Sequence, residues 1–284
     1  MADETLRIGA FLSIAKGIDK VVPQAQEIGA NTFQFFTRNP RGGAARTIAE
    51  PEVGRWQELR QAVGIAGVCG HLPYTVNLAT EKDNLIEFAV MVVENDLRRM
   101  SVLDIEYLVM HPGSSSGDRQ ASLERVIRVL DQGLQGYQGN SWLLLETMAL
   151  QGHEIGSLDD LAAIWNGLGR PEQVGVCLDS CHLFAAGYDF TKDREVERLV
   201  ADLDQSIGLP RVKVLHLNDS KLPAGSHRDR HANIGEGEIG QRGFLHLLNH
   251  PFIRTLPWQL ETPVSDYREY AKDIATVKQI AGVK

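Results

Sequence analysis

Short apolar runs alternate with longer amphipathic stretches along the whole chain, and this alternation restricts the fold more than any other feature of the sequence. The apolar runs have the length and composition of buried strands. They occupy residues 6–10, 32–36, 66–70, 107–110, 142–145, 174–178, 212–217 and 258–260. The stretches between them are helical in period, and in residues 82–99 Leu85, Phe88, Ala89, Val92 and Val93 fall on one helix face. Eight strand–helix units in 284 residues predict an α/β fold, a (β/α)8 TIM barrel, as a single domain of residues 1–284. A doubly wound open sheet is the alternative.

Composition argues against several classes of protein. The longest notable apolar stretch, residues 88–93, is far shorter than the roughly 20 residues of a membrane span. The acidic start, residues 1–4, lacks the basic and apolar regions of a secretory signal. Three cysteines leave one unpaired in any disulfide framework, which favours a reducing compartment. We therefore expect a cytoplasmic protein without a membrane partner.

Side chains that bind metals recur at the ends of the predicted strands. They are His71, His111, Glu146, Asp179 and Glu261, each one position past a strand, and His216 at the end of the seventh. In a barrel these positions converge on the C-terminal rim, where active sites lie. Imidazoles together with carboxylates suit Zn²⁺ or Mn²⁺, whereas carboxylates alone would suit Mg²⁺. The sequence therefore predicts a metal site at this rim.

Two further places add ligands. His182 follows Asp179 by three residues, and Asp229 and His231 lie in residues 218–240, the longest irregular segment. A connection of that length inside a compact domain is usually functional. The total is nine candidates, which exceeds what two four-coordinate ions need unless ligands are shared, so three ions fit the count.

Three blocks of sequence then point to one family. They are GVCLDSCHLFAAGYD at 175–189, HLNDSK at 216–221 and GSHRDRHANIGEGEIG at 225–240. Together they resemble signatures of the endonuclease IV family of apurinic/apyrimidinic (AP) endonucleases, also called AP endonuclease family 2. The similarity extends from the first strand to residues 260–263. It implies a TIM barrel with three Zn²⁺ ions that cuts duplex DNA 5′ to an abasic site, leaving a 3′-hydroxyl and a 5′-deoxyribose phosphate, and that also removes 3′-blocking groups.

The resemblance also implies a role for each ligand. His71, His111 and Glu146 would hold one ion. Glu146 would bridge to a second ion, which Asp179, His216 and Glu261 complete. A third ion would lie on His182, Asp229 and His231. Glu146, Glu261 and Asp179 would be the catalytic carboxylates, with Mn²⁺ as an alternative metal in part of the site.

Other residues are expected to contact the DNA. Tyr74 matches the aromatic that enters the duplex in the family, and Arg41, Lys221 and Arg230 are candidates for phosphate contacts. Three Zn²⁺ would change the formal charge of -8 to about -2, which weakens the objection that an acidic chain repels DNA. Residues 235–240 match a dinucleotide fingerprint as a string but follow a loop, so no nucleotide cofactor is expected. We expect a monomer.

Some positions depart from the family or lie outside the predicted cluster. Phe11 stands where relatives commonly have His, and Gly42, Gly43 and residues 147–152, including Leu150, also differ. Cys177 and Cys181 are interpreted as packing residues. The remaining histidines, interpreted as surface or helix residues, are His153, His227, His246 and His250.

Two other functions compete with the nuclease. The first is a sugar isomerase or epimerase, in which Glu146, Asp179, His216 and Glu261 surround one Mn²⁺ or Mg²⁺. This leaves five of the nine ligands without a role. The second is a non-catalytic module that binds the lesion without cutting it.

Overall fold

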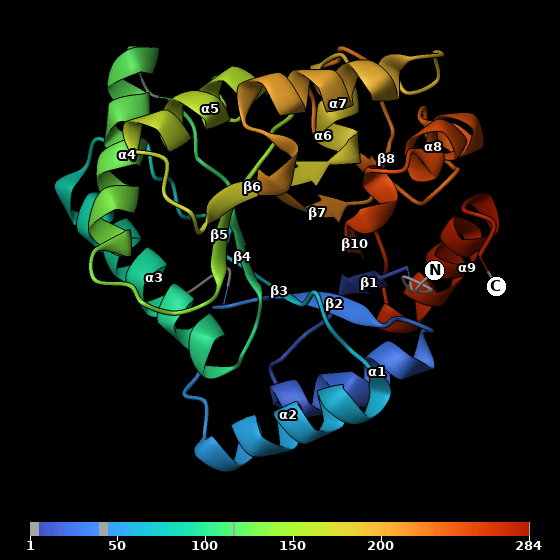
Figure 1. Ribbon diagram of the computed structural model, residues 1–284, viewed down its shortest axis with the longest axis horizontal. Coiled ribbons are helices and arrows are strands. Elements are labelled where there is room, and N and C mark those ends of the chain that lie inside the picture. The colour runs from blue at the N-terminus through green and yellow to red at the C-terminus, as the bar shows by residue number, and fades with distance from the viewer. Residues whose placement is uncertain (1–5, 40–44, 116, 284) are drawn as a thin grey trace.

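Parallel strands close into a barrel, and helices cover its outer surface (Figure 1). This computed structural model describes residues 6–39, 45–115 and 117–283. The barrel strands are β1 (Ile8–Phe11), β2 (Thr32–Phe36), β3 (Cys69–His71), β4 (Tyr107–Met110), β5 (Trp142–Glu146), β6 (Val174–Asp179), β7 (Val212–His216) and β10 (Trp258–Leu260). Each lies beside its neighbour in the chain, and β1 pairs with β10, with Ile8 opposite Trp258. The predicted TIM barrel is confirmed, and the open-sheet alternative is wrong.

The helices form where the sequence outside the strands has an apolar face, and α4, α5 and α6 also begin with a side-chain N-cap. They are α1 (Val21–Glu27), α2 (Glu50–Val63), α3 (Asp83–Val102), α4 (Arg119–Leu134), α5 (Leu158–Gly167), α6 (Ser180–Ala186), α7 (Glu195–Ser206), α8 (Gly240–Asn249) and α9 (Tyr270–Ile280). In α3 the predicted face is buried at Ala89, Val92 and Val93, whereas Leu85 in the first turn is exposed. Helix α5 begins with a capping box, in which Ser157 and Asp160 satisfy each other's backbone N–H groups.

Two segments differ from the sequence prediction. Strand β3 begins at Cys69 instead of residue 66, because Gly67 takes a left-handed conformation with φ of 71° and interrupts the extended chain. Residues 218–240, predicted to be irregular, contain the short strands β8 (Asp219–Ser220) and β9 (His231–Ala232). These two strands pair in an antiparallel sheet separate from the barrel.

The barrel is filled by side chains and is not a pore. Cys69, Val109, Leu144, Cys177 and Val214, from five strands, form a small buried cluster of their own. A larger cluster packs the strands against the helices. Strand ends therefore sit on a rigid, close-packed base, which limits the movement of any side chain they carry.

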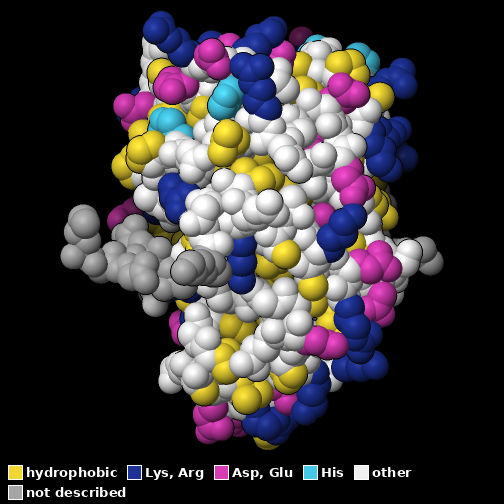
Figure 2. All heavy atoms as spheres, turned by 90° about the vertical axis from the view of Figure 1, so that its right-hand side faces the viewer, with side chains coloured by type: hydrophobic (Ala, Val, Ile, Leu, Met, Phe, Trp, Pro, Cys, Tyr) yellow, Lys and Arg dark blue, Asp and Glu magenta, His cyan; other side chains and the backbone are white. Residues whose placement is uncertain are grey.

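The flank of the molecule at α8 and α9 has a mixed surface. Figure 2 shows basic and acidic side chains interspersed with apolar and neutral ones over the described part of this face. Such a surface lacks the continuous positive field with which some proteins bind nucleic acid by charge alone. Within residues 6–39, 45–115 and 117–283, no helix has both the length and the apolar character needed to cross a membrane.

Candidate metal centre

The predicted ligands meet at the C-terminal rim of the barrel. His71, Glu146, Asp179 and His216 are the last residues of β3, β5, β6 and β7. His111 and Glu261 directly follow β4 and β10, and His182 lies in the first turn of α6. Asp229 and His231 come from the connection between β8 and β9 and from the start of β9. Three ligands predicted one position past a strand are thus the strand's own last residue, at the same end of the barrel.

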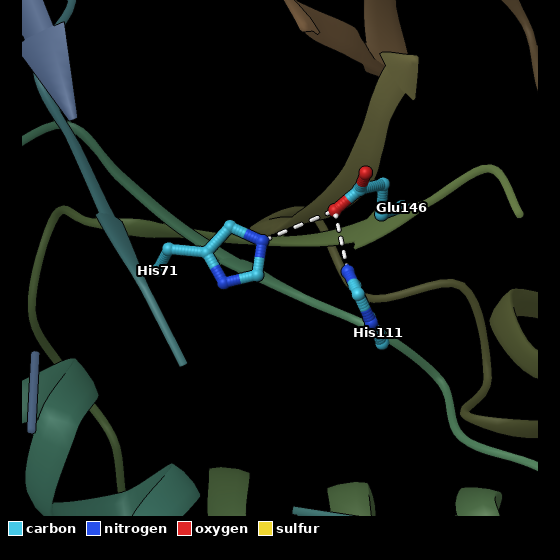
Figure 3. Close-up of side chains that lie close together, drawn as sticks. All are labelled: His71, His111 and Glu146. Carbon is cyan, nitrogen blue, oxygen red and sulfur yellow. Dashed lines mark hydrogen bonds and ion pairs between the residues drawn. The ribbon is translucent and has the colours of Figure 1, made fainter. Parts of the chain in front are cut away.

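The first group of donors contains His71, His111 and Glu146. Figure 3 shows both imidazoles directed at one carboxylate oxygen. His71 Nε2 lies 3.1 Å and His111 Nε2 lies 3.2 Å from Glu146 Oε2. The carboxylate of Glu146 is fully buried, so its charge has no access to solvent and depends on these neighbours.

The second group shares Glu146 with the first. The other oxygen of Glu146, Oε1, lies 3.2 Å from His216 Nδ1, which is also 3.4 Å from Glu261 Oε2. One donor atom from each of Glu146, Asp179, His216 and Glu261 lies within 4.8 Å of the others. The two oxygens of Glu146 therefore face two different donor groups.

The third group is built around Asp229. Its Oδ2 lies 3.4 Å from His182 Nε2, and its Oδ1 lies 3.1 Å from His231 Nε2. Asp179 connects this group to the second, because its Oδ2 is 3.9 Å from His231 Nε2. The nine candidates thus form one continuous cluster of three donor groups with shared carboxylates.

Backbone carbonyls orient the rings of this cluster. The Nδ1 atoms of His71, His182 and His231 lie 2.6, 2.9 and 3.2 Å from the carbonyls of Leu72, Thr147 and Glu261. A ring that donates its Nδ1–H to a carbonyl presents Nε2 as an unprotonated ligand. Among the described residues, His182 Nε2 and His231 Nε2 are buried, and the Asp229 oxygens that face them at 3.4 and 3.1 Å lie outside hydrogen-bonding geometry. Nitrogen lone pairs directed at a carboxylate suit a divalent cation between them.

The electrostatics of the cluster favour positive charge at its centre. Burial opposes ionisation of Glu146, yet His216 and His111 outweigh burial and hold its pKa well below the usual value. Burial likewise disfavours the charged form of His182, but Asp179 and Asp229 raise its pKa well above the usual value. Divalent cations between these side chains would take the place of imidazole protons and compensate the buried carboxylate charge.

Comparison with known proteins decides the family. A family profile described as xylose isomerase-like TIM barrel matches residues 22–280. Over 279 residues the chain is 50% identical to a probable endonuclease 4 of Moorella thermoacetica, covering 98% of this chain and 100% of that protein. The chain belongs to the endonuclease IV family. A probable endonuclease 4 of Heliobacterium modesticaldum is 46% identical, with 92% and 95% covered. The crystal structure of endonuclease IV from Thermus thermophilus superimposes with a TM-score of 0.86 at 34% identity, covering 97% and 99%.

Of the residues predicted to contact DNA in this endonuclease IV family member, Tyr74 lines a cavity beside the metal-ligand cluster. The cavity has a volume of about 540 Å³, and the side chain of Tyr74 is 61% exposed. Lys221 and Arg230 are adjacent, because the Lys221 N–H donates to the Arg230 carbonyl at 2.8 Å. Arg41, Gly42 and Gly43 lie outside the described residues.

The departures from the endonuclease IV pattern have local consequences. Phe11 packs its ring 4.4 Å from that of Phe36 and 6.3 Å from that of His71, so it borders the cluster with an apolar face. Leu150 has a φ of 60°, in the left-handed region that favours glycine. The backbone at 150 thus keeps a glycine-like conformation although the residue is leucine.

The cysteines and the other histidines take different places. Cys177 is buried among the apolar side chains inside the barrel, as predicted. Cys181 is also buried, but its sulfur lies within 4.8 Å of donor atoms of Asp179 and His231. The histidines predicted to lie outside the cluster belong to none of the donor groups found in the described part of the chain: His153, His227, His246 and His250.

Sequence reasoning missed the residues that hold the ligands in place. Asn218 is fully buried, and its Nδ2 donates to Asp179 Oδ2 at 2.6 Å while its Oδ1 accepts the Glu261 N–H at 2.9 Å. Gln34, also fully buried, donates from Nε2 to Glu261 Oε1. The sequence did offer a signal for both residues. Gln34 is a polar amide inside a predicted strand, and Asn218 is an amide directly after another predicted strand.

The glycine-rich string at 235–240 binds a carboxylate of this chain. Asp219 is fully buried, and its oxygens accept N–H groups from Gly235 at 2.9 Å, Gly237 at 3.0 Å and Ile239 at 3.0 Å. A Cβ at Gly237 would lie 2.5 Å from Asp219 Oδ1, so only glycine permits this approach. The string that resembles a nucleotide fingerprint therefore anchors the loop that carries Asp229 and His231.

Replacing Asp219 by asparagine should loosen this loop. An amide NH2 would face backbone N–H donors, and each buried donor left unpaired costs about 1–3 kcal/mol. We expect the free energy of unfolding to fall by about 2–3 kcal/mol in urea titrations, and metal binding at the third donor group to weaken. Asp189→Asn, in a loop turn where Asp189 accepts from Thr191, is the matched control. An unchanged urea midpoint for Asp219→Asn would contradict the anchoring role.

Proposed function

We propose that this chain is a zinc-dependent AP endonuclease that hydrolyses duplex DNA on the 5′ side of an abasic site. Its products are a 3′-hydroxyl and a 5′-deoxyribose phosphate, and the same site removes 3′-blocking groups. Membership of the endonuclease IV family supports the nuclease class. Three Zn²⁺ ions are proposed, with Mn²⁺ as an alternative in part of the site. The chain is proposed to act as a cytoplasmic monomer without a nucleotide cofactor.

The observation that carries this proposal is the shared position of Glu146. Its two oxygens face separate donor groups, at 3.1 Å from His71 and 3.2 Å from His216. A carboxylate shared between groups is the arrangement that holds two cations close enough to act on one phosphodiester. The donor sets proposed for the ions are His71, His111 and Glu146; Glu146, Asp179, His216 and Glu261; and His182, Asp229 and His231.

The chain's own residues would perform the remaining work. Divalent cations supply Lewis-acid polarisation of the phosphodiester and neutralise the charge that develops on it. Glu261, 17% exposed at its side chain, lines the cavity and is placed to orient an attacking water. Asp179 and Glu146, fully buried, fix the imidazoles. Tyr74 at the cavity mouth is proposed to fill the gap in the duplex, and Arg41, Lys221 and Arg230 to contact phosphates.

A one-metal sugar isomerase explains less of the site. The quartet Glu146, Asp179, His216 and Glu261 would serve such an enzyme. It leaves the other donor groups, with His182 and His231 oriented by backbone carbonyls, without a purpose. A backbone carbonyl on the other ring nitrogen is the usual environment of a histidine that ligates metal, so His182 and His231 favour a site with more than one ion.

The proposal is tested with a duplex that carries one tetrahydrofuran abasic analogue. The analogue cannot undergo β-elimination, so a cut must be hydrolytic. We expect zinc-loaded protein to cut directly 5′ of the analogue and to leave a 3′-hydroxyl that a polymerase extends. The undamaged duplex is the control. Absence of cutting with three zinc ions per chain would reject the proposal, and about one metal per chain with ketose turnover would favour the isomerase.

A further inference from the structure

We infer that Gln34 is a positioning residue that orients the carboxylate of Glu261 toward the metal-ligand cluster. This inference rests on the proposed function of that cluster and adds a residue to it. Gln34 lies in β2, whereas Glu261 follows β10, and β1 separates the two strands in the barrel order. The contact between them therefore reaches past β1 through the barrel interior.

The contacts around Glu261 define its orientation. Gln34 Nε2 donates to Glu261 Oε1 at 2.5 Å, and Asn218 Nδ2 lies 3.5 Å from Glu261 Oε2. Each oxygen thus has an amide donor of its own. A carboxylate oxygen has two lone pairs, so each oxygen of Glu261 retains one lone pair that could bind a metal ion in the cluster. Glu261 Oε2 accordingly lies 3.4 Å from His216 Nδ1.

A role in general stability does not explain Gln34. Its side chain is fully buried, yet among the described residues its Oε1 has no hydrogen-bond partner. An unsatisfied buried oxygen destabilises the fold, and an apolar side chain of the same size would avoid that penalty. The contact that compensates for this unsatisfied oxygen is the hydrogen bond that Gln34 donates to Glu261. A carboxylate is acceptor only, which also decides that the NH2 end of Gln34 faces it.

The barrel provides a matched control in Gln259. This glutamine is equally buried, and its Nε2 donates to Thr32 Oγ1 at 2.8 Å and Gly67 O at 3.2 Å. Its Oε1 is also unpartnered among the described residues. Gln34 and Gln259 thus share residue type, burial and an unsatisfied oxygen, and differ in whether they contact Glu261.

The experiment compares Gln34→Met and Gln259→Met in the full chain loaded with zinc. Met keeps the volume and removes the donor. For Gln34→Met we expect kcat for incision of the abasic duplex to fall about 10–100-fold with KM within about twofold, because residues that orient metal ligands have effects of that size. We also expect zinc release to a colorimetric chelator to be about 10-fold faster. Gln259→Met should lower the melting temperature without either change.

The outcomes separate this inference from the proposed function. Equal losses in both variants, in proportion to their melting temperatures, would reduce Gln34 to a structural residue and overturn the inference. If wild-type protein cuts no abasic duplex, the proposed function fails, but faster zinc release from Gln34→Met alone still supports positioning. Should Gln34→Met not fold, Gln34→Glu keeps the shape and opposes the Glu261 carboxylate, and unchanged zinc release and kcat in that variant overturn the inference.

Discussion

Glu146→Gln is expected to lose incision by at least ~10³-fold while the protein remains folded and binds abasic duplex. Glu146 contacts His71, His111 and His216, and its two oxygens belong to two donor groups. Gln has the same shape but only one oxygen and no charge, so it cannot bridge two cations. The loss corresponds to about 4 kcal/mol of transition-state stabilisation. Single-turnover incision and a mobility-shift titration measure the two properties separately.

Glu106→Gln is the matched control for this variant. Glu106 lies just before β4, at the opposite end of the barrel, where it accepts N–H groups from Gly67 and Val68 at 3.2 Å. Its replacement should leave incision within about twofold while lowering stability by about 1 kcal/mol, the usual size of a hydrogen bond. Incision by Glu146→Gln at the wild-type rate would refute the bridging role, whatever its effect on stability.

Removal of metal is expected to abolish incision and to destabilise the fold. The cluster holds four carboxylates, Glu146, Asp179, Asp229 and Glu261, and two of them are fully buried. An ion present at 100 times its Kd stabilises the folded state by about 2.7 kcal/mol, so the three proposed ions would supply a large part of a typical domain's stability. Calorimetry before and after dialysis against a chelator measures this loss, and elemental analysis gives the number of ions.

Zinc added back should restore both incision and the melting temperature, whereas Mg²⁺ should restore neither, because imidazole ligands select zinc. The control is the Glu146→Gln protein, whose melting temperature should respond less to the chelator. Full incision by protein that elemental analysis finds free of metal would contradict the proposed mechanism.

The barrel could be predicted well from the sequence because each strand is recognised from its own few residues. Each barrel strand is a short apolar run, and such a run needs no knowledge of its partner to be recognised. The error at β3 came from Gly67, whose positive φ ends the extended chain in a way that an apolar run does not reveal. The strands β8 and β9 were missed because two-residue pairings depend on contacts across the loop and leave no periodicity.

The donor groups could be anticipated in outline only. Strand-end position predicted that His71, His111 and Glu146 converge, since every parallel strand ends at the same rim. Their division into three groups came from the resemblance to a family. Gln34 and Asn218 could not be found, because the value of a buried amide depends on which carboxylate lies within its reach in the folded barrel. Arg41 lies outside the described residues, and its proposed contact with DNA stays a prediction.

The pairing of β1 with β10 has a consequence for the order of events during protein synthesis. The ring closes only when Ile8 meets Trp258, and the last ligand, Glu261, follows the closing strand directly. A growing chain therefore carries eight of the nine ligands, from His71 to His231, before the ninth has left the ribosome. Non-local pairing of this kind forms late. The full donor set thus comes into existence only after residue 261 has been synthesised and the ring has closed, so metal binding by the complete cluster would follow both events.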